Sequence, residues 1–308
     1  MSDTIRVESL RGIMMRGPGI TATLPFYEDM WGLSLAHAED GEALLRGTGP
    51  EAFLYGLKDG PVYGIDHVHF AMPDRAAIDA LHAQVLARNG CLLGQPAPFD
   101  DWIGGYGFEM LDPDDRRLRF RTEARVHEDQ NDWAKPRKVS HVVLNTPDME
   151  DRQKFYCDVL GFRVSDYSAD QMVFLRCNTD HHSIALVRGQ YPSVNHVAFE
   201  MPTIDEFMRG IGRMKQKGHV PTWGPGRHGP GNNPFAYFVS PSGFVIEFTS
   251  ELQQIDEATH EARVWSRTDP EQMDRWMTAG PPTPAQRAVM QGRPDPGFAE
   301  LRAMAEAG

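Results

Sequence analysis

The hydrophobic and polar positions of this chain form short alternating runs, separated by longer segments with a helical pattern. Alternation with a period of two predicts strands, and it occurs at residues 7–13, 65–71, 139–145 and 195–200. Each strand precedes a predicted helix that ends near a glycine, and these helices are residues 20–31, 74–89, 148–160 and 203–217. Further strands follow, such as "FAYFVS" and "FVIEFTS", which the turn "SPSG" joins. The pattern therefore predicts an α+β fold of four tandem βαβββ modules.

The second half of the chain repeats the first at a nearly constant spacing. "HVHFAMP" begins at His67, and the similar "HVAFEMP" begins at His196. The same offset separates "FYEDMWGL" at Phe26 from "FYCDVLGF" at Phe155, and Pro113 and Pro241 of two later strand pairs are separated by nearly the same offset. One offset across three separate landmarks indicates a tandem duplication. We therefore expect two similar domains, each a curved, barrel-like mixed sheet with helices outside.

The predicted boundaries divide the chain into three parts. Residues 1–125 form the first copy and residues 138–250 form the second, with a polar linker between them. After the second copy, the chain changes to short helical stretches broken by "AGPPTP" and "GRPDPG". Trp265 and Trp276 favour docking of residues 251–308 on the body as helices, and a partly mobile extension is the alternative.

Three residues on predicted strands of the second copy offer metal-ligand chemistry, and they are His141, His196 and Glu247. Two imidazoles and one carboxylate are the ligand set of a non-haem ferrous site with open positions. By sequence spacing, their counterparts in the first copy are Ser9, His67 and Arg119. Arginine is a fixed cation, so the set in the first copy cannot hold a divalent ion. Hydrogen-bonded core histidines are the alternative, but they would not explain why the two sets differ at two of the three positions. We therefore predict a metal site in the second copy alone.

Further polar residues are expected near the same place. "NTDHHSIALV" carries His181 and His182 before a strand, and "GPGRHGPGNN" presents His228 in a glycine-rich loop. Tyr237 lies on the strand "FAYFVS", and the first copy has Glu109 at that position. Imidazoles and a phenol beside a metal site supply acid–base groups. The alternatives are a surface turn for one of the adjacent histidines and an ordinary core role for the tyrosine.

Composition narrows the class of function. A chain of 308 residues is long enough for two domains with substantial cores. The net charge is −12 and no basic cluster stands out, so neither nucleic acid nor an anionic membrane is an expected partner. We expect no membrane span and no signal peptide, because no apolar run has the required length. The three cysteines lack CxxC spacing, which favours free thiols in a reducing, cytoplasmic compartment. We also expect a homo-oligomer.

These motifs resemble those of a known family, the type I extradiol ring-cleaving dioxygenases of the vicinal oxygen chelate superfamily. The resemblance covers residues 5–250 and is strongest from residue 138 onward. There, "GRHGPGNNPFAYFVSPSGFVIEF" is similar to the family's signature of a histidine, a tyrosine, a proline–glycine turn and the glutamate ligand. Ala236 and Ser240 depart from the usual residues, which bears on the subfamily more than on the reaction. The family also has an inactive N-terminal half and an active C-terminal half, as the repeat suggests independently.

Carried over residue by residue, the resemblance implies that the iron ligands are His141, His196 and Glu247. It implies that His182 is the acid–base residue beside dioxygen, with His181 as a substitute because the spacing to the next histidine is one residue short. His228 and Tyr237 match residues that hydrogen-bond the substrate hydroxyls. The implied enzyme uses Fe(II), or Mn(II) as the other suitable metal, and O2 as co-substrate. It cleaves the ring of a catechol-type aromatic diol beside the two hydroxyls.

Two other functions fit the same scaffold. One is another metal-dependent reaction of the superfamily, either glyoxalase-like isomerisation or hydroquinone cleavage. Glyoxalase-like sites typically use two carboxylates, and this chain offers a single glutamate. The other is a non-catalytic protein that binds and sequesters a ligand, for which no complete set of metal ligands would be needed.

Overall fold

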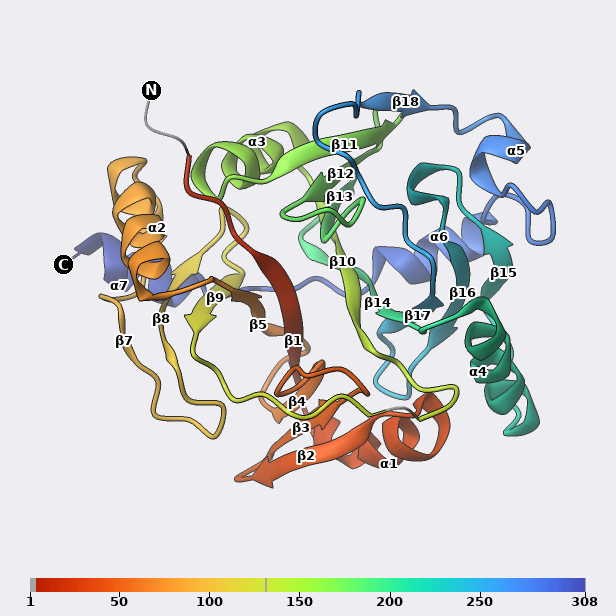
Figure 1. The fold of residues 1–308 in the computed structure, drawn as a ribbon, viewed down its shortest axis with the longest axis horizontal. Coiled ribbons are helices and arrows are strands. Elements are labelled where there is room, and N and C mark those ends of the chain that lie inside the picture. The colour runs from red at the N-terminus through yellow and green to blue at the C-terminus, as the bar shows by residue number, and fades with distance from the viewer. Residues whose placement is uncertain (1–3, 131, 308) are drawn as a thin grey trace.

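Two nine-stranded mixed sheets lie side by side in the computed structural model, which describes residues 4–130 and 132–307 (Figure 1). One sheet comes from the first half of the sequence and one from the second. The helices pack outside the sheets, with α2 at one end of the molecule and α4 at the other. The predicted α+β fold class is confirmed.

The first half contains two modules in succession. Its elements are β1 (Ser9–Gly17), η1 (Ile20–Thr23), α1 (Leu24–Phe26), η2 (Tyr27–Trp31), β2 (Ser34–Glu39), β3 (Glu42–Arg46), β4 (Tyr55–Asp59), β5 (Gly64–Ala71), α2 (Arg75–Ala87), β6 (Cys91–Leu92), β7 (Ala97–Pro98), β8 (Tyr106–Leu111) and β9 (Arg117–Thr122). The strand order is β2-β3-β4-β1-β5-β9-β8-β6, with β7 paired to β8. Strand β1 is parallel to β4 and antiparallel to β5, so the two modules meet along β1 and β5.

The second half repeats this arrangement. Its elements are β10 (Lys138–Thr146), α3 (Met149–Lys154), η3 (Phe155–Val159), β11 (Arg163–Ser168), β12 (Met172–Arg176), β13 (Ile184–Arg188), β14 (Ser193–Glu200), α4 (Ile204–Gln216), β15 (Trp223–Arg227), η4 (Pro230–Asn232), β16 (Pro234–Val239) and β17 (Val245–Thr249). The strand order is β15-β16-β17-β14-β10-β13-β12-β11-β18, where β18 (Arg263–Trp265) comes from the C-terminal tail. Each sheet is open rather than a closed barrel, because its two edge strands do not pair with each other.

Local sequence signals set the helix boundaries. Asp74 and Thr203 cap the N-termini of α2 and α4, and each side chain accepts a hydrogen bond from a backbone N–H of the first turn. Gly32 and Gly161 follow the first helix of each half with φ of 88° and 74°, a conformation that favours glycine. The helices before them finish in the π-helical turns η2 and η3, which the strand and helix periodicity does not predict.

The two halves share one hydrophobic core. Trp31, at the end of η2, is fully buried and crosses from the first half into the second. Its ring stacks on Phe248 at a centroid distance of 3.6 Å and meets Phe199 and Phe238 edge-on at 5.6 and 5.7 Å. Phe199 and Phe248 lie on β14 and β17, so the first half supports the outer face of these two strands.

The C-terminal tail runs back across both halves (Figure 1). It contains β18 (Arg263–Trp265), α5 (Pro270–Met273), α6 (Pro284–Gln291) and α7 (Ala299–Ala307). Strand β18 pairs in parallel with β11, and Arg302 of α7 forms an ion pair with Asp115 of the first half. None of the helices in the described chain is both long and apolar enough to span a bilayer.

Candidate metal centre

Four adjacent strands of the second sheet bring the predicted site residues into one row. His141 of β10 lies opposite Ala198 of β14, Ala198 lies beside Glu247 of β17, and Glu247 lies opposite Tyr237 of β16. His196 precedes Ala198 by two residues and therefore points to the same face. Ala198 is the small residue in the middle of the row, and its methyl group leaves space between the longer side chains around it.

The three predicted ligands converge at this space. Nε2 of His141 lies 3.3 Å from Oε2 of Glu247, and Nε2 of His196 lies 3.1 Å from the same oxygen. The potential ligand atoms all lie within 4.8 Å of one another, and all three residues are buried. Neither carboxylate oxygen of Glu247 has a hydrogen-bond partner in the described part of the chain. A buried carboxylate without hydrogen-bond donors is costly unless it is paired or binds a metal, so this donor set fits a divalent cation.

Neighbouring side chains orient the two imidazoles. Nδ1 of His196 lies 2.8 Å from Oδ1 of Asn195, and Asn195 donates to Asn145 at 3.0 Å. Because an amide oxygen only accepts, His196 carries its proton on Nδ1 and keeps Nε2 free for a metal. Nδ1 of His141 lies 3.1 Å from the hydroxyl of Ser140, which leaves its Nε2 directed at Glu247.

The electrostatics favour an anionic carboxylate surrounded by neutral groups. Burial would raise the pKa of Glu247, but the two adjacent imidazoles lower it to about 2. Burial lowers the pKa of His228 to about 4 and takes that of His182 well below its ordinary value. Burial, and then the charge of Glu247, raise the pKa of Tyr237 well above its usual range. At neutral pH Glu247 is therefore ionised, the imidazoles of His182 and His228 are neutral, and the phenol of Tyr237 keeps its proton.

The predicted acid–base residues surround a cavity of about 270 Å³ next to the three ligands. Nε2 of His228 lies within hydrogen-bond distance of the Tyr237 hydroxyl, at 2.9 Å, on the side of β15 and β16. His182 lies on the other side, with its ring 4.1 Å from that of His141. His182 lines the cavity, whereas His181 is fully buried and is bonded to Asp166 instead. Of the adjacent pair, His182 is therefore the one that faces the cavity.

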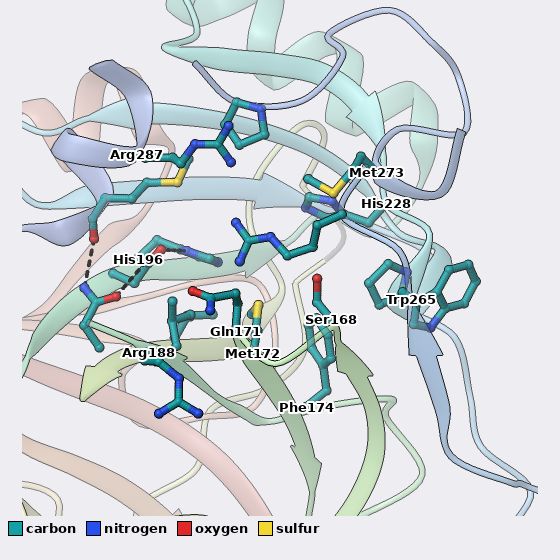
Figure 2. Close-up of a pocket in the computed structure, with 18 of the residues that line it drawn as sticks. Ser168, Gln171, Met172, Phe174, Arg188, His196, His228, Trp265, Met273 and Arg287 are labelled. Carbon is teal, nitrogen blue, oxygen red and sulfur yellow. Dashed lines mark hydrogen bonds between the residues drawn. The ribbon is translucent and has the colours of Figure 1, made fainter. Parts of the chain in front are cut away.

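The C-terminal tail supplies cavity residues that sequence reasoning did not identify. In Figure 2, Trp265, Met273 and Arg287 reach the cavity from the tail, opposite residues of the sheet such as Phe174. Arg267 also lines the cavity. In the sequence Trp265 is a sign of docking, but no motif or spacing there places the tail residues at the site.

The strand registers correct one part of the comparison between the halves. Sequence spacing pairs Ser9 with His141, which requires an insertion in the following helix of the first half, and this pairing is wrong. Strands β1 and β10 instead carry a bulge at the same place, and Gly12 lies opposite His69 as His141 lies opposite Ala198. The counterpart of His141 is therefore Gly12, because the shared bulge keeps the repeat offset constant through this strand.

The first half fills the corresponding space with other contacts. The counterparts of Ala198 and Glu247 are His69 and Arg119, which lie side by side on β5 and β9. The ring of His69 stacks on Phe53 at 5.6 Å, and Arg119 forms an ion pair with Glu109 at 2.7 Å. A side chain could not be added at Gly12, because its Cβ would lie 2.9 Å from the carbonyl oxygen of Phe53. These residues do not form a metal-ligand set.

Comparison with known proteins finds a matching family model and a solved structure with a similar fold. The family model described as the Glyoxalase/Bleomycin resistance protein/Dioxygenase superfamily matches residues 138–248. The solved structure of a Mn(II)-bound glyoxalase from Novosphingobium aromaticivorans is 38% identical, with a TM-score of 0.85, and the match covers 91% of this chain and 94% of that one.

Two curated relatives match over shorter stretches. Metapyrocatechase 2 of Cupriavidus necator is 36% identical over 122 residues, which are 39% of this chain and 38% of that protein. An iron-dependent extradiol dioxygenase of Rhodococcus jostii is 33% identical over 140 residues, which are 41% of this chain and 47% of that protein. The match to this chain therefore spans less than half the length of each of these two relatives.

Proposed function

The chain belongs to the Glyoxalase/Bleomycin resistance protein/Dioxygenase superfamily, and from this premise we propose that it is an extradiol dioxygenase that cleaves the ring of a catechol. The observation that carries the proposal is the arrangement around one cavity. Two histidines and one glutamate form a possible metal site, His182 lies on one side of it, and the His228–Tyr237 pair lies on the other. The extradiol relatives named above support the same reaction class.

In this proposal His141, His196 and Glu247 hold a divalent ion. Three protein ligands on one side leave open positions for exogenous oxygen ligands. When bound, the ion supplies Lewis acidity that lowers the pKa of the two catechol hydroxyls, and it provides a redox route to dioxygen. Iron is our first choice for this ion. The Rhodococcus relative is named iron-dependent. Manganese is the alternative, because the Novosphingobium glyoxalase structure is Mn(II)-bound.

The protein's own groups then handle protons and position the substrate. The Tyr237 hydroxyl lies 2.9 Å from Nε2 of His228. With neutral His228 unprotonated at Nε2, Tyr237 donates to it and keeps its own oxygen free to accept a hydrogen bond from a substrate hydroxyl. A substrate proton can therefore pass through the Tyr237 hydroxyl to His228. His182 lies on the opposite side, where its imidazole can accept or return a proton near the site of dioxygen.

The lining of the cavity is consistent with a small aromatic substrate. Apolar side chains form much of the wall, including Val143, Met172, Phe174, Trp223 and Met290. The cavity volume of about 270 Å³ lies just below the range of about 300–1,000 Å³ that is typical of ligand pockets. We therefore favour a catechol with a single ring.

Glyoxalase-like isomerisation is the second candidate, because a solved structure that is 38% identical over 91% of this chain is named a glyoxalase. The cluster of potential ligands in the described chain contains a single carboxylate, Glu247. It also has the His228–Tyr237 pair beside it, which suits a substrate with two adjacent hydroxyls. Both features favour ring cleavage.

One experiment separates these functions. The protein is loaded with Fe(II) or Mn(II) under argon and mixed with catechol in air, and oxygen uptake and the yellow ring-cleavage product are measured. A parallel assay uses the hemithioacetal of methylglyoxal and glutathione. We expect one O2 consumed per product formed and no isomerisation. Isomerisation without oxygen uptake would establish the glyoxalase function instead, and catechol binding without either reaction would indicate a ligand-binding protein.

Two variants test the assigned roles. Glu247→Ala should lose both bound metal and turnover, because it removes the anionic ligand. His182→Phe should retain metal but turn over slowly, because the acid–base group is lost. Full activity in either variant would contradict the role proposed for that residue.

A further inference from the structure

A chain of three buried side chains leads away from the cavity behind His182. Nδ1 of His182 lies 3.0 Å from Nδ1 of His181, and Nε2 of His181 lies 3.0 Å from Oδ2 of Asp166. His181 is fully buried, and Asp166 is 3% exposed. The proposed function uses His182, but it does not account for the two residues behind it.

The hydrogen-bond partners of Asp166 decide which atom donates in each of these hydrogen bonds. Oδ2 of Asp166 also accepts from the indole N–H of Trp265 at 2.7 Å, and Oδ1 accepts from the backbone N–H of Arg263 at 2.8 Å. Burial would raise the pKa of Asp166, but the bonds from His181, Trp265 and Arg263 outweigh it and lower the pKa. Asp166 is therefore an anion that only accepts, and Nε2 of His181 must be the donor.

The tautomer of each histidine follows from that direction. Neutral His181 with its proton on Nε2 offers a lone pair at Nδ1. His182 must then donate from its own Nδ1, which leaves Nε2 of His182 without a proton. Nδ1 of His182 is occupied by its hydrogen bond to His181. Because His182 lines the cavity, its unprotonated Nε2 remains available to a ligand there.

We propose that Asp166 and His181 are positioning residues that hold His182 in the Nδ1–H tautomer, with its Nε2 lone pair available to the substrate and dioxygen. This inference rests on the proposed function for its catalytic meaning, although the tautomer itself does not depend on it. Asp166, His181 and His182 together form what we term the Asp166 relay. The relay prepares His182 to accept a proton, and it prevents rotation of the imidazole away from the cavity.

The comparison between the two halves supports a functional role over simple packing. Asp166 lies opposite Phe174 after a bulge in β11, and His37 occupies the equivalent place after the same bulge in β2. With the constant offset that relates β1 and β4 to β10 and β13, the counterparts of His181 and His182 are Ala52 and Phe53. The relay is therefore found in the half that has the metal ligands and is replaced in the half that lacks them.

The C-terminal tail has a specific part in this arrangement. Trp265 and Arg263 both belong to β18, which pairs with β11 along Asp166. The backbone N–H of His181 also donates to the carbonyl of Gln253 at 2.8 Å. Gly231 of η4 packs closely against His181, since a Cβ on Gly231 would lie 3.3 Å from Nδ1 of His181. The tail thus supplies two of the three hydrogen bonds that keep Asp166 an acceptor, in addition to lining the cavity.

Nuclear magnetic resonance can read the tautomer without any turnover. The full chain is labelled with ¹⁵N-histidine and loaded with Zn(II), a diamagnetic ion that accepts the same ligand types, and His182→Phe identifies the signals of His182. We expect the Nδ1–H tautomer in the unmodified protein. In Asp166→Asn we expect a shift toward the Nε2–H tautomer, because the amide cannot accept from Trp265, Arg263 and His181 together. An Nε2–H tautomer in the unmodified protein, or no change in Asp166→Asn, would overturn the relay.

Steady-state kinetics test its effect on catalysis. With Fe(II)-loaded enzyme and catechol, Asp166→Asn and His181→Phe should each lower kcat by about tenfold, with metal content and KM within about twofold. The double variant should be no slower than the slower single variant, because both changes act through one unit. A loss below about threefold in Asp166→Asn, or losses that multiply in the double variant, would overturn the proposal.

A matched control and a separate readout keep the outcomes distinct. Asp158→Asn removes the same charge from an exposed position of η3 and should leave kcat unchanged. If His181→Phe does not fold, the near-isosteric Asp166→Asn carries the test. If the unmodified enzyme does not turn over catechol, the proposed function fails, whereas the Zn(II) spectra still decide whether the relay exists.

Discussion

Trp31 offers the sharpest test of how the first half of the chain supports the site in the second. We predict that Trp31→Ala destabilises the metal-free protein by about 4 kcal/mol. An aromatic side chain buries about 150–250 Å², which corresponds to about 4–6 kcal/mol at about 25 cal/mol per Å². Alanine keeps part of this burial, and measured truncations of buried aromatic residues cost about 3–5 kcal/mol.

A second substitution at the same position refines the magnitude. The indole N–H of Trp31 is buried and has no hydrogen-bond partner within residues 4–130 and 132–307. Trp31→Phe keeps an aromatic ring against Phe248 and removes this unpaired group, whose desolvation costs about 1–3 kcal/mol. The loss of area and the removal of the unpaired donor therefore offset each other. We expect Trp31→Phe to change the stability by less than about 1 kcal/mol.

The assay is urea unfolding followed by circular dichroism, together with Mn(II) affinity measured by calorimetry. Because Trp31 packs on the back of the strands that carry Ala198 and Glu247, Trp31→Ala should also weaken metal binding. Trp133→Ala is the matched control, since Trp133 is 67% exposed and its removal should stay within about 0.5 kcal/mol. A cost below about 1 kcal/mol for Trp31→Ala, or unchanged Mn(II) affinity, would refute the view that the two halves share one supporting core.

Three further predictions follow from single residues. Mn(II) at about 100 times its Kd should stabilise the protein by about 2.7 kcal/mol and so raise its Tm. Glu247→Gln should abolish this rise in Tm, and an equal rise in the variant would contradict the role of Glu247 as a metal ligand. Tyr237→Phe should retain metal but lower kcat by about tenfold or more, since His228 loses its hydroxyl partner, and unchanged kcat would remove Tyr237 from the mechanism. Burial, then the charge of Arg119, lower the pKa of His67 from 6.5 to about 4. Below pH 6.5 the unfolded chain therefore binds a proton at His67 that the folded protein does not. The folded state is thus fully stable in this respect at pH 7 and loses stability as the pH falls toward 4. By pH 5 the free energy of unfolding falls by about 2 kcal/mol. His67→Asn should therefore reduce the drop in urea midpoint between pH 7 and pH 5, and an equal drop in the variant would refute this.

Much of the fold could be predicted because its signals are local. The alternation that indicated strands and the glycines that end helices depend on neighbouring residues, and the repeat spacing supplied the order of the four modules. The π-helical turns η2 and η3 could not be predicted this way, because hydrogen-bond spacing inside a helix leaves no mark in a pattern of apolar residues. The error at Ser9 has a similar origin, since a bulge adds one residue to a strand without a distinctive sequence.

The sequence by itself determined which residues offer metal-ligand chemistry and which half carries them, because residue type and repeat offset are properties of the chain alone. His141, His196 and Glu247 were identified from these properties, and the cluster that they form in space is the one expected. Only the tertiary structure decided which of the two adjacent histidines faces the cavity, because neighbouring residues in a loop turn according to their partners. Asp166 lies on β11, His181 lies in the loop before β13, and Trp265 lies far along the chain in the C-terminal tail. Contacts over such separations arise from the packing of whole strands, and no local pattern in the sequence records them.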